Sequence, residues 1–244
     1  MAGNVTNVTE FSYVTLNDGV TCFDESTEAG KVYANVLATA LKQPGARRVY
    51  TGVEIENPST LWLFLDWESV EHHKNYRKTE EHGPIIESLN PYVDFTKYMN
   101  KHITVSPFPP EDVLDKTRSP VTEVLLAFFP PDYDVAARAT ATRRLEDYGW
   151  SVENDVPVKG DEEKTGAMLV AFIGWPSVEA HQKFRETDDF KENIGLLREM
   201  PRLVKLSAFH VSCLSKEAEG VAKPHEDDYH QHSHGHGCGS GGCC

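Results

Sequence analysis

The sequence predicts an α+β fold of two ferredoxin-like plaits, each with the element order β-α-β-β-α-β. One observation is an internal repeat: residues 67–79 recur at 175–187, an offset of 175 − 67 = 108 positions, with seven identities among thirteen positions. The other is that the same succession of apolar patterns and turn residues occurs on both sides of a Pro-rich segment. A period of about one small domain indicates two related modules rather than a solenoid. In such a plait, helices cover one face of an antiparallel sheet.

The first strand and helix follow from residue type and spacing. Residues 9–16 are rich in β-branched and aromatic side chains and end at the turn Asn17-Asp18-Gly19, which predicts a strand. Ser26 or Thr27 then caps a helix, because apolar residues recur at helical spacing until Gln43-Pro44-Gly45.

The rest of the first plait contains a second type of strand. Residues 47–56 alternate between polar and apolar, as a half-buried strand does. Residues 61–66 are apolar on both faces, so this strand must be covered on both sides. A helix over 69–81, followed by a short helical piece, and a strand over 92–105 complete the order.

The second half repeats the order. Strands are expected at 121–129, 150–156, 167–174 and 203–213, helices at 130–149 and 177–188, and a polar loop at 158–165. Two alignments of the final strands stay open: His102 matches His210 at an offset of 108, whereas Asn90-Pro91 matches Met200-Pro201 at 110. We therefore expect four parts: plait 1 at 1–105, a Pro-rich linker at 106–120, plait 2 at 121–214, and a disordered His/Cys-rich tail at 215–244.

Composition excludes several classes of partner. The 244 residues carry 38 acidic against 24 basic residues, a net charge of −14, which argues against nucleic acid or an anionic membrane as the main partner. No apolar run reaches the roughly 18 residues of a spanning helix, and the N-terminus lacks a signal-peptide pattern. The expected location is the cytoplasm.

The repeat also resembles a known superfamily. In both halves an apolar strand leads into Trp-x-Ser-Val-Glu-x-His, as Trp67-Glu68-Ser69 in the first and Trp175-Pro176-Ser177 in the second. This pattern resembles the dimeric α+β-barrel superfamily, in particular its antibiotic-biosynthesis-monooxygenase (ABM) type. The resemblance covers most of residues 9–105 and 121–213.

The resemblance implies a barrel of two plaits packed sheet to sheet, with a small-molecule cavity in each half. Such barrels are normally homodimers, so here one chain would form a pseudo-dimer, and a higher oligomer stays open. The implied activity is that of a monooxygenase or a cyclase/dehydratase of secondary metabolism, with a small hydrophobic, aromatic or polyketide-like substrate. The barrel would need no cofactor. Fold alone does not choose among these activities.

His73 and His181 are the candidate catalytic bases, because imidazole titrates near neutral pH and can take a proton from a phenol or an activated carbon. Both share a helix face with an aromatic residue three positions later, Tyr76 or Phe184. A core histidine bonded to a strand carbonyl would show the same spacing. Since only Tyr76 carries a hydroxyl, we expect the first half to be the active one, with Tyr76 as a hydrogen-bond partner.

Large aromatic residues of the doubly apolar strands are the candidate substrate contacts, on the expectation that the cavity lies inside the barrel. They are Trp62, Phe64, Trp67, Phe172 and Trp175. Trp67 and Trp175 could equally be packing anchors at the strand ends. The equivalent of Trp62 is the smaller Val170, so the two cavities would differ in shape.

The C-terminal tail is a candidate metal ligand set, separate from the barrel. Its imidazoles alternate and its thiols follow, as His230, His232, His234, His236, Cys238, Cys243 and Cys244. Such a segment binds Zn, Ni or Cu ions, although its glycines impose no fixed geometry. The terminal Gly-Gly-Cys-Cys also resembles a doubly prenylated end, while nothing else in the chain does.

Two hypotheses of different classes result. The first is a cofactor-independent enzyme acting on a hydrophobic small molecule in the barrel. The second is a non-enzymatic ligand-binding or stress-type barrel whose tail handles metal. A cavity with a histidine nitrogen facing it would favour the enzyme, and a packed interior with both histidines buried against strands would favour the alternative.

Overall fold

The computed structural model describes residues 7–221, so the predicted metal ligands His230–Cys244 lie outside the described residues. The first plait contains β1 (Val8–Leu16), α1 (Glu28–Leu41), β2 (Ala46–Val53), β3 (Thr60–Trp67), α2 (Val70–Tyr76), α3 (His82–Glu87) and β4 (Val93–Ser106). The second contains β5 (Val121–Phe129), α5 (Val135–Ala141), β6 (Tyr148–Ser151), β7 (Val156–Val158), β8 (Asp161–Trp175), α6 (Val178–Phe184), α7 (Asp188–Arg198) and β9 (Lys205–Val211). Between the plaits lies α4 (Glu111–Leu114), and β10 (Leu214–Glu217) follows the second.

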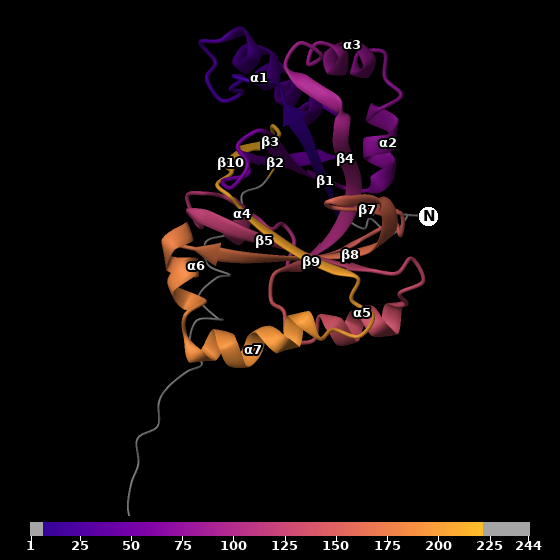
Figure 1. Ribbon diagram of the computed structural model, residues 1–244. Coiled ribbons are helices and arrows are strands. Elements are labelled where there is room, and N and C mark those ends of the chain that lie inside the picture. Colours follow the sequence, from indigo (N-terminus) through magenta and orange to yellow (C-terminus); the bar gives the residue numbers. More distant parts are fainter. Residues whose placement is uncertain (1–6, 222–244) are drawn as a thin grey trace, which may run out of the picture.

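Both halves have the strand order of a ferredoxin-like plait. The first is ordered β2-β3-β1-β4 and the second β6-β8-β5-β9, with every neighbouring pair antiparallel. Figure 1 shows α1–α3 on one side of the molecule and α5–α7 on the opposite side, with the strands between them. The predicted α+β class and its two plaits are confirmed.

The two sheets join at both edges and form a closed barrel. At one edge β4 pairs with β6, with Ile103 opposite Ser151. At the other edge β10 pairs with β2, and Val211 at the end of β9 forms a bridge with Glu54. Only Ser212 and Cys213 separate β9 from β10, so the chain itself closes the ring.

The strand register decides between the two alignments of the final strands. His102 lies opposite Glu10, and His210 lies opposite Glu123 in the same way. The two junctions between the halves also correspond, since 103 + 108 = 211. The offset of 108 therefore extends from the repeat into the last strands.

Strand alternation divides the barrel into an inner and an outer core. Val124, Leu126 and Phe128 of β5 face the interior, whereas Leu125 and Ala127 face the helices. The same alternation places Trp62 and Phe64 inside and Leu61 and Leu65 outside. Each doubly apolar strand is thus covered on both sides, as the sequence predicts.

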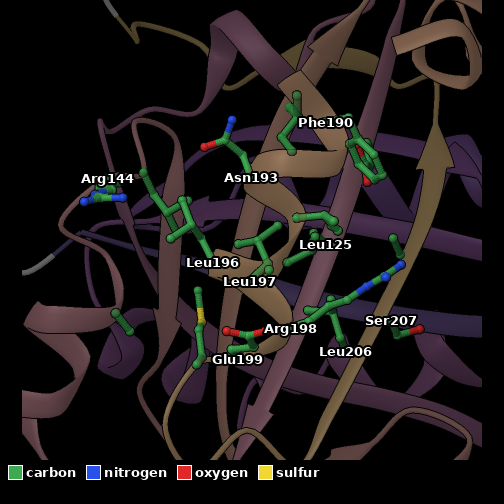
Figure 2. Close-up of a pocket in the computed structure, with 18 of the residues that line it drawn as sticks. Leu125, Arg144, Phe190, Asn193, Leu196, Leu197, Arg198, Glu199, Leu206 and Ser207 are labelled. Carbon is green, nitrogen blue, oxygen red and sulfur yellow. The ribbon is translucent and has the colours of Figure 1, made fainter. Parts of the chain in front are cut away.

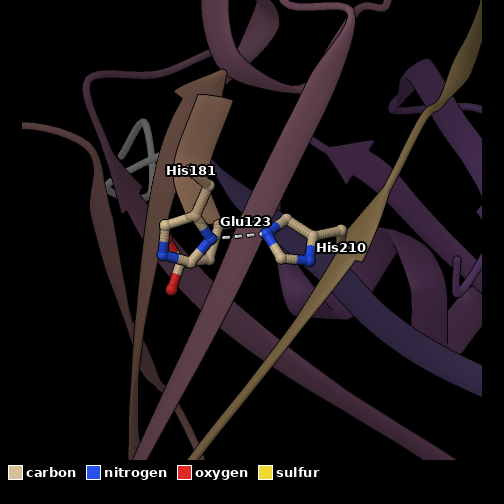
Figure 3. Close-up of side chains that lie close together, drawn as sticks. All are labelled: Glu123, His181 and His210. Carbon is tan, nitrogen blue, oxygen red and sulfur yellow. Dashed lines mark hydrogen bonds and ion pairs between the residues drawn. The ribbon is translucent and has the colours of Figure 1, made fainter. Parts of the chain in front are cut away.

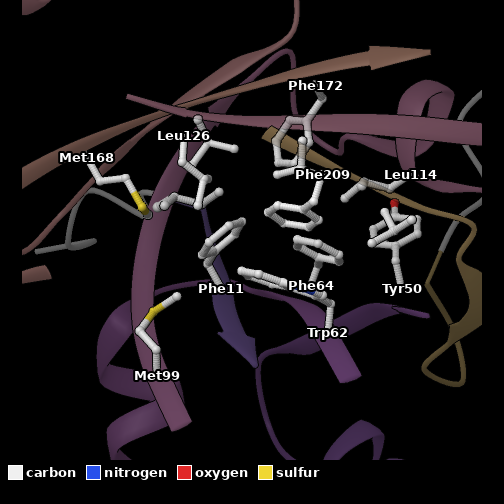
Figure 4. Close-up of a cluster of buried hydrophobic side chains, with 14 of the residues drawn as sticks. Phe11, Tyr50, Trp62, Phe64, Met99, Leu114, Leu126, Met168, Phe172 and Phe209 are labelled. Carbon is white, nitrogen blue, oxygen red and sulfur yellow. The ribbon is translucent and has the colours of Figure 1, made fainter. Parts of the chain in front are cut away.

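The interior is filled with side chains. Trp62 stacks on Phe209 at 4.5 Å between ring centroids, and Phe64 meets Phe172 of the other half edge-on at 6.1 Å (Figure 4). Leu114 of α4 is fully buried in the same cluster. The expectation of an interior cavity lined by Trp62, Phe64 and Phe172 is therefore corrected: these rings form the packed core that holds the halves together.

The helical layers of the two halves differ in thickness. Helix α1 has 14 residues and buries an apolar face that includes Tyr33, Val36 and Leu37, whereas α5 has 7 residues and no buried one. The sequence predicts a helix over 130–149, but α5 spans only Val135–Ala141. Residues 142–147 are mostly polar or charged, so no apolar stripe continues the helix beyond that point. The second half is left with space above its sheet.

Smaller differences from expectation concern the connections. A β7–β8 hairpin replaces the polar loop at 158–165, because Val156 and Val158 are buried in the inner core. Strand β10 extends from Leu214 into the segment assigned to the tail, since it finds a free edge on β2. No helix within residues 7–221 is long and apolar enough to cross a membrane.

We predict that Phe64→Ala lowers the free energy of unfolding by about 3–5 kcal/mol, because it opens a cavity in a core to which both halves contribute. Urea denaturation of the full chain measures it. Val135→Ala is the control, since Val135 is 82% exposed and its loss should cost under about 0.5 kcal/mol. A loss at Phe64 as small as at Val135 would show that the barrel interior is not a packed core.

Candidate active site in the second half

The repeated motif places one histidine on the first turns of a short helix in each half. Ser177 is the N-cap of α6 and accepts a hydrogen bond from the backbone N–H of Ala180 at 3.2 Å, and Ser69 caps α2 in the same manner. Trp67 and Trp175, which end the preceding strands, stack on His73 and His181 at 5.2 and 4.8 Å between ring centroids. The motif thus turns each imidazole back onto the sheet.

In the second half four side chains form a continuous row. Glu56 accepts from Nδ1 of His210, and Nε2 of His210 lies 2.7 Å from Nδ1 of His181. Nε2 of His181 lies 3.4 Å from Oε2 of Glu123 (Figure 3). We call this row of side chains, Glu56–His210–His181–Glu123, the second row.

The first half has an equivalent first row, Glu153–His102–His73–Glu10. Here Glu153 contacts Nδ1 of His102 at 2.7 Å, the two imidazoles are 2.8 Å apart, and His73 Nε2 is 3.6 Å from Glu10. In both rows the glutamate on the second histidine comes from the opposite half, just beyond β6 or β2. Each row therefore depends on the pairing of the two plaits.

Hydrogen-bond counting assigns the protons of the second row. Burial alone would raise the pKa of Glu56, but hydrogen bonds from the side chain and backbone of His210 hold that pKa below its usual value. An ionised Glu56 only accepts, so Nδ1 of His210 carries a proton. With one proton on each ring, Nε2 of His210 accepts a hydrogen bond from Nδ1 of His181. Nε2 of a neutral His181 then presents its lone pair towards Glu123.

The pKa of His181 supports the neutral form. Burial lowers it most, Glu123 opposes that shift, and the nearby His210 and Arg185 lower it further. His181 is thus neutral at pH 7 and able to accept a proton, and Glu123 lies where it would stabilise the resulting imidazolium.

The two rows differ at the glutamate that contacts the helix histidine, which is Glu10 in the first row and Glu123 in the second. In the first half Asn100 donates to Oε1 of Glu10 at 2.6 Å and Trp67 donates to Oε2 at 3.1 Å. In the second half Trp175 donates to Oε2 of Glu123 at 3.2 Å, but position 100 + 108 = 208 is alanine. Within residues 7–221, Oε1 of Glu123 therefore has no hydrogen-bond partner.

A pocket of about 1380 Å³ opens beside Glu123, between the outer face of β5 and β9 and the helices α5, α6 and α7. Its lining includes Glu123, His181 and His210 of the second row, and the apolar residues Leu125, Leu197 and Leu206 (Figure 2). The short α5 leaves this volume, whereas α1 fills the corresponding space of the first half. Cavities that bind one small molecule have volumes of roughly 300–1,000 Å³, so this pocket has room for such a ligand.

The pocket changes the assignment of the predicted site residues. His181 and Trp175 line it, whereas His73, Tyr76 and Trp67 are buried in the first half and are not among its lining residues. Tyr76 is 6% exposed and its hydroxyl finds no hydrogen-bond partner in residues 7–221, while the equivalent Phe184 is 39% exposed at the pocket. The preference for the first half is corrected, because the side chains of α1, not the hydroxyl of Tyr76, decide which half is open.

Sequence reasoning missed the four glutamates and the pairing of the histidines. The only available signal was the match of His102 with His210 at the repeat offset. Glu56 lies 154 residues from His210, and no local pattern connects them. Closure of the barrel brings them together.

Glu123, His181 and His210 could also hold a metal ion, since one ligand atom of each lies within 4.8 Å of the others. Two imidazoles and a carboxylate form a common ligand set for zinc or non-haem iron. However, the two imidazoles are already 2.7 Å apart, which is hydrogen-bond length, and a metal would have to replace that bond. Because His73 and His102 make the same contact, the hydrogen-bonded row accounts better for the geometry.

Comparison with solved structures identifies the architecture. A candidate monooxygenase from Fusobacterium nucleatum aligns with a TM-score of 0.55 and 8% identity over 90% of this chain and 97% of that chain. An anthrone oxidase-like protein aligns with a TM-score of 0.60 and 12% identity over 90% and 96% of the two chains. A cofactor-independent oxygenase from Streptomyces nogalater aligns with 40% of this chain and 88% of that chain, at 16% identity and a TM-score of 0.32.

The sequence matches no protein-family model. It also matches no curated protein. At these identities the structural likeness establishes the fold and leaves activity to the geometry of the site. The chain therefore has the fold of a dimeric α+β barrel, built here from two plaits in one polypeptide.

Proposed function

We propose that the second half is a cofactor-independent active site that removes a proton from a hydrophobic aromatic or polyketide-like molecule. The observation that carries this proposal is the unpartnered Oε1 of Glu123 at the pocket, joined through Oε2 to the neutral His181. A carboxylate backed by an imidazole is an effective general base when the water around it is excluded. The names of the aligned proteins are consistent with this chemistry.

The row gives the proton a route out of the pocket. A proton taken by Glu123 passes to Nε2 of His181, whose Nδ1 proton moves to His210, whose own Nδ1 proton moves to Glu56. The side chain of Glu56 is 46% exposed and can release the proton to water. Each group gains and loses one proton, but the relay leaves both imidazoles protonated on Nε2 instead of Nδ1. Both rings must therefore exchange protons with solvent, in addition to Glu56, before the next turnover.

The electrons left on the substrate decide the reaction. In an oxygenase the carbanion would reduce O₂, and in a cyclase or dehydratase it would form a carbon–carbon bond or expel hydroxide. In either case the residues of this chain take the proton, stabilise the anion and keep water away. Donation by Trp175 to Oε2 of Glu123 keeps the carboxylate oriented towards the pocket.

A role without chemistry is the second candidate, and the packed interior and closed first row favour it for the first half. We propose that the first half serves as a scaffold that supplies Glu56 to the second row. Any role of the tail in metal binding remains a proposal from the sequence.

We expect Glu123→Gln to reduce kcat by about 10²–10⁴-fold, because the amide cannot accept the proton. Turnover of anthrone, followed by oxygen uptake and product absorbance, is a suitable first assay. The matched control is Glu10→Gln, the equivalent change in the closed first row, which should leave kcat within about 3-fold. Equal losses in both variants would refute the assignment of the second half.

We expect Ala208→Asn to close the open row by reproducing the bond that Asn100 makes with Glu10. The new amide would occupy Oε1 of Glu123, and kcat should fall by about 10-fold or more. Ala208→Leu controls for volume, since it fills similar space without donating. If both variants lose activity equally, steric blockage rather than the free oxygen explains the effect.

The pH profile should show the neutral form of His181. Because its pKa is lowered, kcat/KM should be constant near pH 7 and fall only below pH 6.5, the ordinary value, as His181 becomes protonated. Removing the positive charge in Arg185→Gln raises that pKa, so the acid limb should move to higher pH. Arg77→Gln, at the equivalent position beside His73, should leave the limb in place; an unmoved limb in Arg185→Gln would argue that another group limits the reaction.

A further inference from the structure

The charge of the pocket is opposite to that of the protein. Its lining contains Arg143, Arg144, Arg185, Arg198 and Arg202 against Glu56, Glu123 and Glu199, which is 5 − 3 = +2. The whole chain has a net charge of −14. A positive lining in an acidic protein focuses the local potential and attracts anions.

Most of the acidic groups are already engaged, whereas most of the arginines are not. Glu56 is bonded to His210, Glu123 accepts from Trp175, and Arg202 pairs with Asp132 at 2.5 Å. Within residues 7–221, the guanidinium groups of Arg143, Arg144 and Arg198 make no hydrogen bond or ion pair, and the carboxylate of Glu199 makes none either. Arg185 makes none with the described residues either and lies over the ring of Phe190, so four cations without an ion pair surround the pocket with one such anion.

The position of two of these arginines is specific to the open half. Counted from the helix N-caps Thr27 and Asp134, positions nine and ten are Val36 and Leu37 in the first half and Arg143 and Arg144 in the second. In the first half these side chains pack on the sheet. In the second half α5 has already ended, and the same places in the chain supply guanidinium groups to the pocket.

The floor of the pocket is apolar. Leu125 and Leu206 lie on the strands, and Leu196 and Leu197 lie on α7 beside them, with Arg144 and Arg198 around this group (Figure 2). A ligand that satisfies both features has a hydrophobic ring system and an anionic oxygen group. The planar guanidinium fork favours a carboxylate, which it binds with two parallel hydrogen bonds.

We propose that the substrate is a polycyclic aromatic carboxylate, with its rings on the leucine floor and its carboxylate attracted by the arginines of the lining, among them Arg143, Arg144 and Arg198. This deepens the proposed function, on which it rests for the reacting end of the pocket. It adds that the arginines select the substrate by charge, while Glu123 acts on a carbon or phenol at a distance from the carboxylate.

Binding of two matched probes to the full chain tests the proposal. Anthracene-2-carboxylate and anthracene-2-methanol share a ring system and differ in charge, and their fluorescence reports binding. We expect the carboxylate to bind at least about 10-fold more tightly in about 20 mM NaCl, with the ratio falling in about 300 mM NaCl. In Arg143→Gln/Arg144→Gln and in Arg198→Gln the ratio should drop below about 3-fold, while the affinity of the alcohol is unchanged.

Arg77→Gln is the control for total charge, because Arg77 is the first-half equivalent of Arg185 and lies outside the pocket lining. It should leave the ratio unchanged. Equal affinities of the two probes for the wild-type chain, or a ratio that survives all the arginine variants, would overturn the proposal.

Glu123→Gln separates this proposal from the proposed function. It should abolish turnover but keep the carboxylate preference, since it leaves the three arginines in place. Normal turnover in Glu123→Gln with loss of preference in the arginine variants would refute the catalytic assignment and support the substrate class. The reverse outcome would refute the substrate class alone.

Discussion

Strand pairing between the two halves is the constraint on which the rest of the structure depends. Each plait ends in a strand that continues beyond its own sheet, β4 onto β6 and β9–β10 onto β2. These junctions give the exposed edges partners and close the barrel. Closure buries the aromatic inner core and delivers Glu56 and Glu153 to histidines of the opposite half. A single plait would have neither a complete core nor a complete row.

Duplication within one chain allows the two halves to diverge. A homodimer must carry the same substitutions in both copies, whereas here Asn100 and Ala208 differ at equivalent positions. The first half has a long α1 and a fully bonded Glu10, and the second has a short α5 and an open Glu123. One half can then be optimised for packing while the other keeps the volume and unpaired groups that a site requires.

The second row combines burial with an exit for charge. Burial lowers the pKa of His181 and keeps it neutral, and Glu123 supplies the charge that stabilises its protonated form. The chain of hydrogen bonds ends on Glu56, where water is accessible. Such a row needs both imidazoles in the same tautomer. The glutamate from the other half, Glu56 in the second row, selects that tautomer by accepting a hydrogen bond from Nδ1 of His210.

Local patterns were sufficient for the plait order, for the starts of α2 and α6, and for the placement of His73 and His181 on helices beside a strand-ending Trp. Alternation also required that the strand containing Trp62 and Phe64 be covered on both sides. These features depend on residues within a few positions of one another, so spacing alone reveals them. The tertiary structure alone decided which face holds the cavity, which half is open and which glutamates complete the rows. Those properties follow from the volume and contacts of side chains that lie 29 to 154 residues apart. The folding of each plait brings the nearer pairs together, and closure of the barrel brings together those of opposite halves.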